Sequence, residues 1–147
     1  MKKKVLILGG GISKERLISL ETARAVYKAL IKKNYKVIIC EPDGNLTNKI
    51  KSFKPNIVFN ALHGRFGEDG YIQAILEAAK VKYTHSGVLA SSIAMDKEVS
   101  KKLFLKNKIN TPKYIKYIFS KDNLINKRIL FKVKKKLKFP AVIKPIN

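Results

Sequence analysis

The chain has 147 residues, enough for one ordinary domain or for one domain and part of a second. Hydrophobic residues make up 46% of it, which supports a packed core and excludes a disordered chain. The net charge is +22, but the lysines are spread along the whole chain without an aromatic RNA-binding motif, so no specific nucleic-acid partner is expected.

The first element in chain order is a short apolar run at 5–8, interpreted as a buried strand because it is too short for a signal peptide. No apolar run approaches the roughly 20 residues that cross a bilayer, so we expect no membrane partner. The single cysteine, Cys40, excludes an internal disulfide and fits a reducing, cytoplasmic location. It closes an apolar run and is predicted to be a small buried side chain.

Strands and helices are predicted to alternate through residues 1–95. Glycines follow the first strand at 9–11, and Ser13 is a candidate N-cap for a helix that ends near Asn34. Further strands are expected at 37–40, 57–62 and 83–84, further helices at 47–53 and after Gly70, and a small-residue helix or turn at 87–95. This alternation predicts an α/β fold with a doubly wound, Rossmann-like parallel sheet.

Residues 96–147 are predicted to form a second, incomplete domain. The expected elements are a helix at 96–106, a strand at 112–119, an amphipathic helix carrying Ile125, Ile129, Val133 and Leu137, and a strand at 139–144. Because these elements leave apolar faces uncovered, this part is expected to be held less firmly than residues 1–95.

The loop at 62–70, LHGRFGEDG, carries the most chemistry-bearing side chains. A buried strand that leads into a glycine-rich polar loop and then a helix is where open α/β sheets bind ligands. His63 follows the strand directly, whereas His85 is expected to be a structural residue. Two histidines without further ligand spacing do not predict a metal site. A tight turn with surface charges would explain the same loop without any function.

The glycines at 9–11 do not complete a dinucleotide-binding fingerprint, because Lys14 occupies the position of its third glycine. The free N–H groups at the start of the following helix still favour an anion or a zwitterion. Glu15 stands in that first turn. It could stabilise the dipole of its own helix, or it could contact a ligand.

Several motifs, in order, resemble the D-alanine–D-alanine ligases of the ATP-grasp superfamily. They are GGGISKERLISL at 9–20, LHGRFGEDG at 62–70, Gln73, YTHSG at 83–87, SxxxMDKxxSK at 91–101 and FPAVIKP at 139–145. The resemblance implies a pre-ATP-grasp substrate domain at 1–95 and the start of a truncated ATP-grasp domain at 96–147. It also implies that ATP and two D-alanines become D-alanyl-D-alanine, ADP and phosphate for peptidoglycan precursor synthesis.

The resemblance further implies roles for five residues. Glu15 would bind the ammonium of the first D-alanine, and His63 would line the same catalytic pocket with Glu68 in support. Lys97 and Lys144 would contact the phosphates of ATP, where ammonium groups offset negative charge. ATP and Mg²⁺ are the implied cofactors, although the family's magnesium ligands are absent from this sequence. D-alanine and ATP are the implied partners, and the complete enzyme is expected to be a homodimer.

Three functions remain open from the sequence. The first is D-alanine–D-alanine ligation. The second is an ATP-grasp ligase with D-lactate or D-serine as acceptor, whose discriminating residues would lie beyond Asn147. The third is a non-enzymatic remnant or binding module. Because the sequence stops soon after FPAVIKP, we expect no ligase activity from this chain alone.

Overall fold

The computed structural model describes residues 2–118, 127–137 and 139–146. The chain divides into two compact units, Met1–Met95 and Asp96–Asn147, and each is described by itself. Within the described ranges, no helix is long and apolar enough to cross a membrane.

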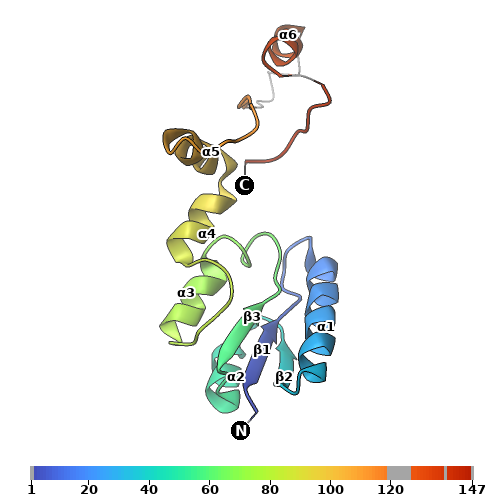
Figure 1. Cartoon of the computed structure of the whole chain (residues 1–147), viewed down its shortest axis with the longest axis vertical. Coiled ribbons are helices and arrows are strands. Elements are labelled where there is room, and N and C mark those ends of the chain that lie inside the picture. Colours follow the sequence, from blue (N-terminus) through green and yellow to red (C-terminus); the bar gives the residue numbers. More distant parts are fainter. Residues whose placement is uncertain (1, 119–126, 138, 147) are drawn as a thin grey trace. The chain divides into compact units, whose positions relative to one another are not determined.

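Strands and helices alternate along the first unit (Figure 1). They are β1 (Lys4–Leu8), α1 (Arg16–Lys32), β2 (Lys36–Cys40), α2 (Leu46–Phe53), β3 (Ile57–Asn60), α3 (Tyr71–Ala78) and α4 (Val88–Met95). The three strands form a parallel sheet in the order β2-β1-β3. Beyond β3, the expected strand at 83–84 is reduced to an isolated parallel bridge between Tyr83 and Val58.

The central strand β1 is buried on both faces because helices cover both sides of the sheet (Figure 1). Val5 and Ile7 point to one face and pack with Ala23 of α1. Leu6 and Leu8 point to the other face, where they join the cluster formed with α2 and α3. The predicted doubly wound parallel α/β fold is therefore confirmed.

Cys40 ends β2 and is buried, as the sequence predicts. Burial raises the pKa of its thiol, because the thiolate loses solvation inside the unit. At neutral pH the side chain therefore behaves as a small apolar group rather than as a nucleophile.

The start of α1 differs from the prediction. The expected N-cap, Ser13, lies before the helix, which begins at Arg16 with Glu15 as its cap residue. The hydroxyl oxygen of Ser13 accepts a hydrogen bond from Glu15 N–H at 3.1 Å, and its carbonyl accepts one from Arg16 N–H. Ser13 therefore closes a local turn instead of capping the helix. The end of α1 agrees better, since Asn34 adopts a left-handed φ of 64° just after it.

The second unit contains α5 (Lys97–Lys106) and α6 (Lys127–Lys136). Asp96 caps α5, because its carboxylate accepts hydrogen bonds from the N–H groups of Glu98 and Val99, both at 2.9 Å. The helix expected at 96–106 is thus confirmed. α6 agrees with the amphipathic pattern at Ile129 and Val133, whereas Leu137 follows the helix and Ile125 lies outside the described residues.

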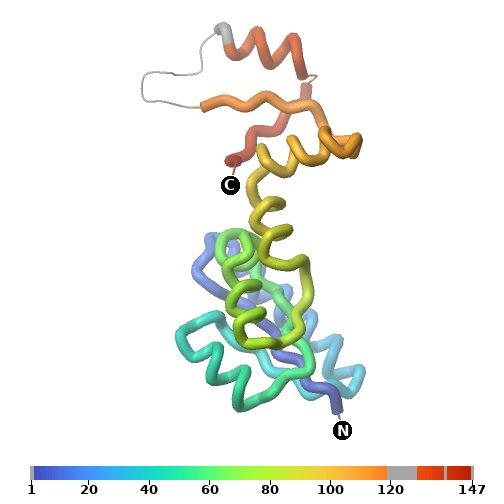
Figure 2. Tube along the Cα trace, turned by 90° about the vertical axis from the view of Figure 1, so that its left-hand side faces the viewer, coloured from blue at the N-terminus to red at the C-terminus, as the bar shows by residue number. Residues whose placement is uncertain are grey.

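The strands expected at 112–119 and 139–144 are wrong for the part that is described, since 112–118 and 139–146 contain no strand. Figure 2 follows both as open stretches of chain. Alternation of side chains predicts an extended backbone, but a strand also needs a neighbour for its ladder of hydrogen bonds. Side chains of α5 hold the first stretch instead: Lys101 donates to Pro112 O at 3.0 Å, and Lys116 pairs with Glu98.

Candidate functional site at the carboxyl edge of the sheet

Three loops leave the sheet at the same edge, because all three strands run in the same direction (Figure 1). The loop after β1 carries the glycines and Glu15, the loop after β2 starts at Glu41, and the loop after β3 carries His63 and Glu68. This shared edge is where the sequence predicts a ligand site.

The buried hydroxyl of Ser19 joins two of these loops to α1. Gly10 N–H donates to Ser19 Oγ at 2.9 Å, and Ser19 Oγ donates to Ala61 O at 2.8 Å. Both donor and acceptor capacities are used, and the side chain is fully buried. The sequence interpretation missed this role, although a serine four residues before Ala23 on the buried face of α1 is the signal for it.

Glu15 lies against the backbone of Gly64. A Cβ atom at Gly64 would lie 2.4 Å from Glu15 Oε2 and 2.8 Å from Ser13 Oγ, so a side chain there would push these two groups aside and would also strain the left-handed backbone. The Glu15 carboxylate makes no capping hydrogen bond to α1. No basic side chain in the described ranges forms an ion pair with it. The structure thus brings Glu15 to the loop of His63, where no described basic side chain pairs with its charge.

His63 is half-buried between α1 and its own loop. Its Nε2 atom lies 3.1 Å from the hydroxyl of Thr22, and its Nδ1 atom lies 3.7 Å from Glu68 Oε1. Glu68 is fixed in turn, because its Oε2 atom accepts a hydrogen bond from Gly64 N–H at 2.8 Å. Glu15, His63 and Glu68 therefore gather around Gly64, and two carboxylates beside an imidazole favour a cationic group.

A second glycine, Gly67, is held by two buried amides. Asn60 Nδ2 donates to Gly67 O at 2.8 Å and Gln73 Nε2 donates to the same oxygen at 2.9 Å. A Cβ atom at Gly67 would lie only 2.5 Å from Leu62 Cβ, so the loop packs closely on the end of β3. This arrangement fixes the segment that carries Glu68, and the sequence interpretation did not identify the role of Asn60.

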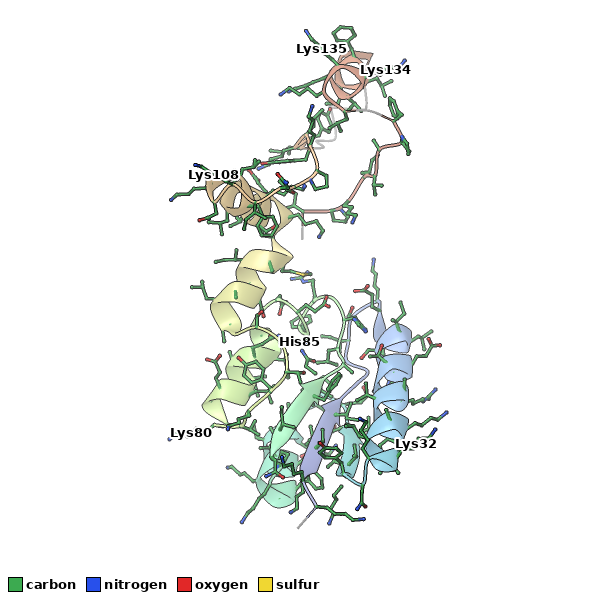
Figure 3. The ribbon with its side chains drawn as sticks, in the orientation of Figure 1. Lys32, Lys80, His85, Lys108, Lys134 and Lys135 are labelled. Carbon is green, nitrogen blue, oxygen red and sulfur yellow. The ribbon has the colours of Figure 1, made fainter. Side chains whose placement is uncertain are left out.

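Asn60 also contacts His85. Asn60 Nδ2 lies 3.1 Å from His85 Nδ1, so the exposed His85 contacts the buried amide that supports the loop. His85 is labelled in Figure 3 and belongs to the segment between α3 and α4. The structural role expected for His85 agrees with this contact.

Asp69 braces the same loop from its other end. Its carboxylate accepts hydrogen bonds from Phe66 N–H at 2.8 Å and from Tyr71 N–H at 3.1 Å, just before α3 begins. The loop after β2 contributes Glu41, which pairs with Arg16 and accepts from Gly11 N–H at 3.3 Å. Glu41 is thus neutralised by a partner, in contrast to Glu15.

The two lysines implied by the family resemblance belong to the second unit. The backbone N–H of Lys97 donates to Ile146 O at 2.9 Å, and its Nζ atom lies 3.4 Å from the same oxygen. Lys144 is exposed two residues before Ile146. The start of α5 and the segment that carries Lys144 are therefore held together inside this unit.

The described residues do not form a metal site. No group of three or more His, Cys, Asp or Glu side chains in the described part of the chain could hold a metal ion. The donor set for Mg²⁺ is thus not assembled by these residues, and no role is derived for the ion here. Many lysines simply point outward, as Lys32 and Lys80 do in Figure 3.

The sequence of this chain is similar to those of known D-alanine–D-alanine ligases. The family described as D-ala D-ala ligase N-terminus matches residues 41–86. The D-alanine–D-alanine ligase of Pelagibacter ubique is 67% identical over 147 residues, which is 100% of this chain and 47% of that protein. The corresponding ligase of Carboxydothermus hydrogenoformans is 42% identical over 141 residues, covering 96% of this chain and 45% of that protein.

A solved structure extends the likeness to three dimensions. The D-alanine–D-alanine ligase from Bacillus anthracis, crystallised in complex with ATP, superposes with a TM-score of 0.69 at 30% identity. The alignment covers 89% of this chain and 44% of that one. The chain spans about half the length of the curated relatives it matches.

The parallel sheet covered by helices makes this chain an α/β protein, and its fold is similar to that of a solved D-alanine–D-alanine ligase. Within that class, the chain corresponds in sequence and fold to the N-terminal half of the D-alanine–D-alanine ligase family.

Proposed function

We propose that the first unit binds the first D-alanine of an ATP-dependent D-alanine–D-alanine ligase. The complete reaction joins two D-alanines with hydrolysis of ATP to ADP and phosphate and supplies a peptidoglycan precursor. One observation carries the assignment: the Glu15 carboxylate, which pairs with no basic side chain among the described residues, lies against Gly64, the residue that follows His63, at the carboxyl edge of the sheet. Relatives that are named for this activity and share 42% to 67% of the sequence support it.

The chemistry of a D-alanine zwitterion suits this edge. Its ammonium group would donate charge-assisted hydrogen bonds to the Glu15 carboxylate, which has no competing cation among the described residues. Its carboxylate would benefit from the positive end of α1. His63 would line the same pocket, and Glu68 would hold the His63 loop through Gly64 N–H.

The second unit would contribute to the binding of ATP, as the first part of an ATP-grasp domain. Lys97 and Lys144 are the residues that would contact the phosphates, and the link between Lys97 and Ile146 O would keep their segments together. ATP supplies the phosphoryl group that activates a D-alanine carboxylate. The ammonium groups of the two lysines would offset the negative charge of the phosphates.

The same proposal includes the location, the oligomeric state and the metal ion of the complete enzyme. It would work in the cytoplasm as a homodimer, with Mg²⁺ beside ATP. The lone, buried Cys40 agrees with a reducing compartment.

Titration with D-alanine, followed by amide shifts of the ¹⁵N-labelled chain, tests the proposal. The account predicts saturable shifts at Gly10, Gly64 and His63 with roughly millimolar affinity, equivalent to about 4 kcal/mol. Glu15→Gln removes the charge and keeps the shape, so it should weaken binding several-fold. Glu21→Gln, a change at an exposed position of the same helix, is the matched control and should bind normally.

Thermal melting of the same variants separates the two roles of Glu15. If Glu15→Gln loses D-alanine binding at an unchanged melting temperature, Glu15 contacts the ligand as proposed. A lower melting temperature with unchanged D-alanine shifts would mean that Glu15 only stabilises α1, and the proposal would then be wrong.

A further inference from the structure

Counting the available hydrogen bonds shows which group donates in the contact between Thr22 and His63. The Thr22 hydroxyl has one proton, and Ile18 O lies 3.0 Å from its oxygen in the preceding turn of α1. His63 Nε2 lies 3.1 Å from the same oxygen. If the hydroxyl donates to His63, Ile18 O loses that bond. If Nε2 carries the proton, the hydroxyl donates to Ile18 O and accepts from the ring, and both bonds form.

The second arrangement satisfies more groups, so the proton belongs on Nε2. When the ring carries a single proton, that proton on Nε2 leaves the Nδ1 atom unprotonated on the other side. Glu68 Oε1 lies 3.7 Å from that atom, and Glu68 Oε2 is held by Gly64 N–H at 2.8 Å. The Nδ1 atom of His63 and the Oε1 atom of Glu68 are then both hydrogen-bond acceptors, with no donor between them. A bound ammonium group could donate a hydrogen bond to each of them.

We infer that Thr22 is a positioning residue, which holds the proton of His63 on Nε2 and so keeps Nδ1 free to accept a hydrogen bond from the ammonium of an amino-acid ligand. The ligand in this statement rests on the proposed function, whereas the position of the proton does not. Thr22 itself need not touch the ligand, because it acts from the α1 side of the ring.

The proton position is measured directly by ¹⁵N shifts of the histidine rings in the labelled chain. Wild type should show His63 as the Nε2–H tautomer. Thr22→Val has nearly the same shape but no acceptor, so the His63 ring should lose this fixed pattern. Thr22→Ser restores the hydroxyl and should restore the pattern. His85, whose Nδ1 accepts from Asn60, is an internal control and should stay unchanged in every variant.

The consequence for binding is measured separately by D-alanine titration of the same variants. Thr22→Val should weaken binding by about three- to ten-fold, as for the loss of one ordinary hydrogen bond, and Thr22→Ser should recover most of it. A wild-type His63 protonated on Nδ1, or an unchanged His63 ring in Thr22→Val, would overturn the inference. Wild type that binds no D-alanine but shows the expected ring shifts would contradict the proposed function and leave the role of Thr22 standing.

Discussion

Gly64 is the residue on which the geometry of the candidate pocket depends most. Its φ of 70° lies in the left-handed region, and the space where a side chain would start is taken by the Glu15 carboxylate. Its N–H group also holds Glu68. One small residue therefore contacts two carboxylates that come from different loops.

Gly64→Ala should separate these carboxylates. The left-handed backbone would cost about 1–2 kcal/mol of stability for a residue with a Cβ atom, and the new methyl group would displace Glu15. We expect lower stability in urea unfolding and loss of the D-alanine shifts. Gly44→Ala is the control, because a Cβ atom at Gly44 meets nothing within 4 Å. Wild-type affinity in Gly64→Ala would show that the Glu15 position is unimportant.

At the scale of elements, the sequence predicted most of the first unit because its apolar runs are short and bounded by turns. The strands that form β1, β2 and β3 appear where those runs lie, although β3 ends at Asn60 rather than at 62. The error at the start of α1 and the absence of strands in the described part of the second unit have the same cause. Capping and pairing depend on which backbone groups actually meet, and the pattern of side chains does not encode that.

The segment after α3 is fastened to that helix by a bond with a measurable pH dependence. Tyr83 donates its hydroxyl proton to Glu77 Oε1 at 2.6 Å, and this hydrogen bond, with smaller effects of burial and of the Glu77 charge, raises the pKa of Tyr83 to about 12. Since the folded state holds the proton more tightly, the contribution to stability is complete below pH 10 and is lost as the pH rises towards 12.

Ultraviolet titration of tyrosinate checks this bond. Wild type should contain one tyrosine that ionises late, and in Glu77→Gln the pKa of Tyr83 should fall towards its ordinary value of 10.0. Identical titration curves for the two proteins would show that the bond between Tyr83 and Glu77 is absent in solution.

At the scale of the whole molecule, the buried apolar side chains are distributed unevenly. Within the described ranges, every buried hydrophobic residue belongs to the first unit, between Val5 and Leu76. The second unit contributes only the buried polar residue Ser100 in the same ranges. Because burial of apolar surface is the main source of stability, the two units should differ in their resistance to opening.

The protection of backbone amides against hydrogen exchange should therefore drop near Met95. We expect strong protection in β1, β2, β3 and α1, and much faster exchange from α5 onwards, where few apolar contacts hold the helices. Equal protection factors on both sides of Met95 would contradict this account.

The candidate site could be predicted only in part. Glu15, His63 and Glu68 follow strands of one parallel sheet, so the sequence indicates that they gather at one edge. Thr22 and Asn60 were missed because their roles depend on atoms that meet across the fold, as Thr22 and His63 do over 41 positions. Periodicity identifies the buried face of a helix, but it does not say which polar group a side chain on that face will reach.

The most direct test of the central claim is a crystal structure of this chain grown with saturating D-alanine. The account predicts the ammonium nitrogen about 2.7–3.2 Å from a Glu15 carboxylate oxygen, a normal hydrogen-bond distance, with the amino acid beside His63. D-alanine bound elsewhere on the chain, or an empty edge at a saturating concentration, would contradict it.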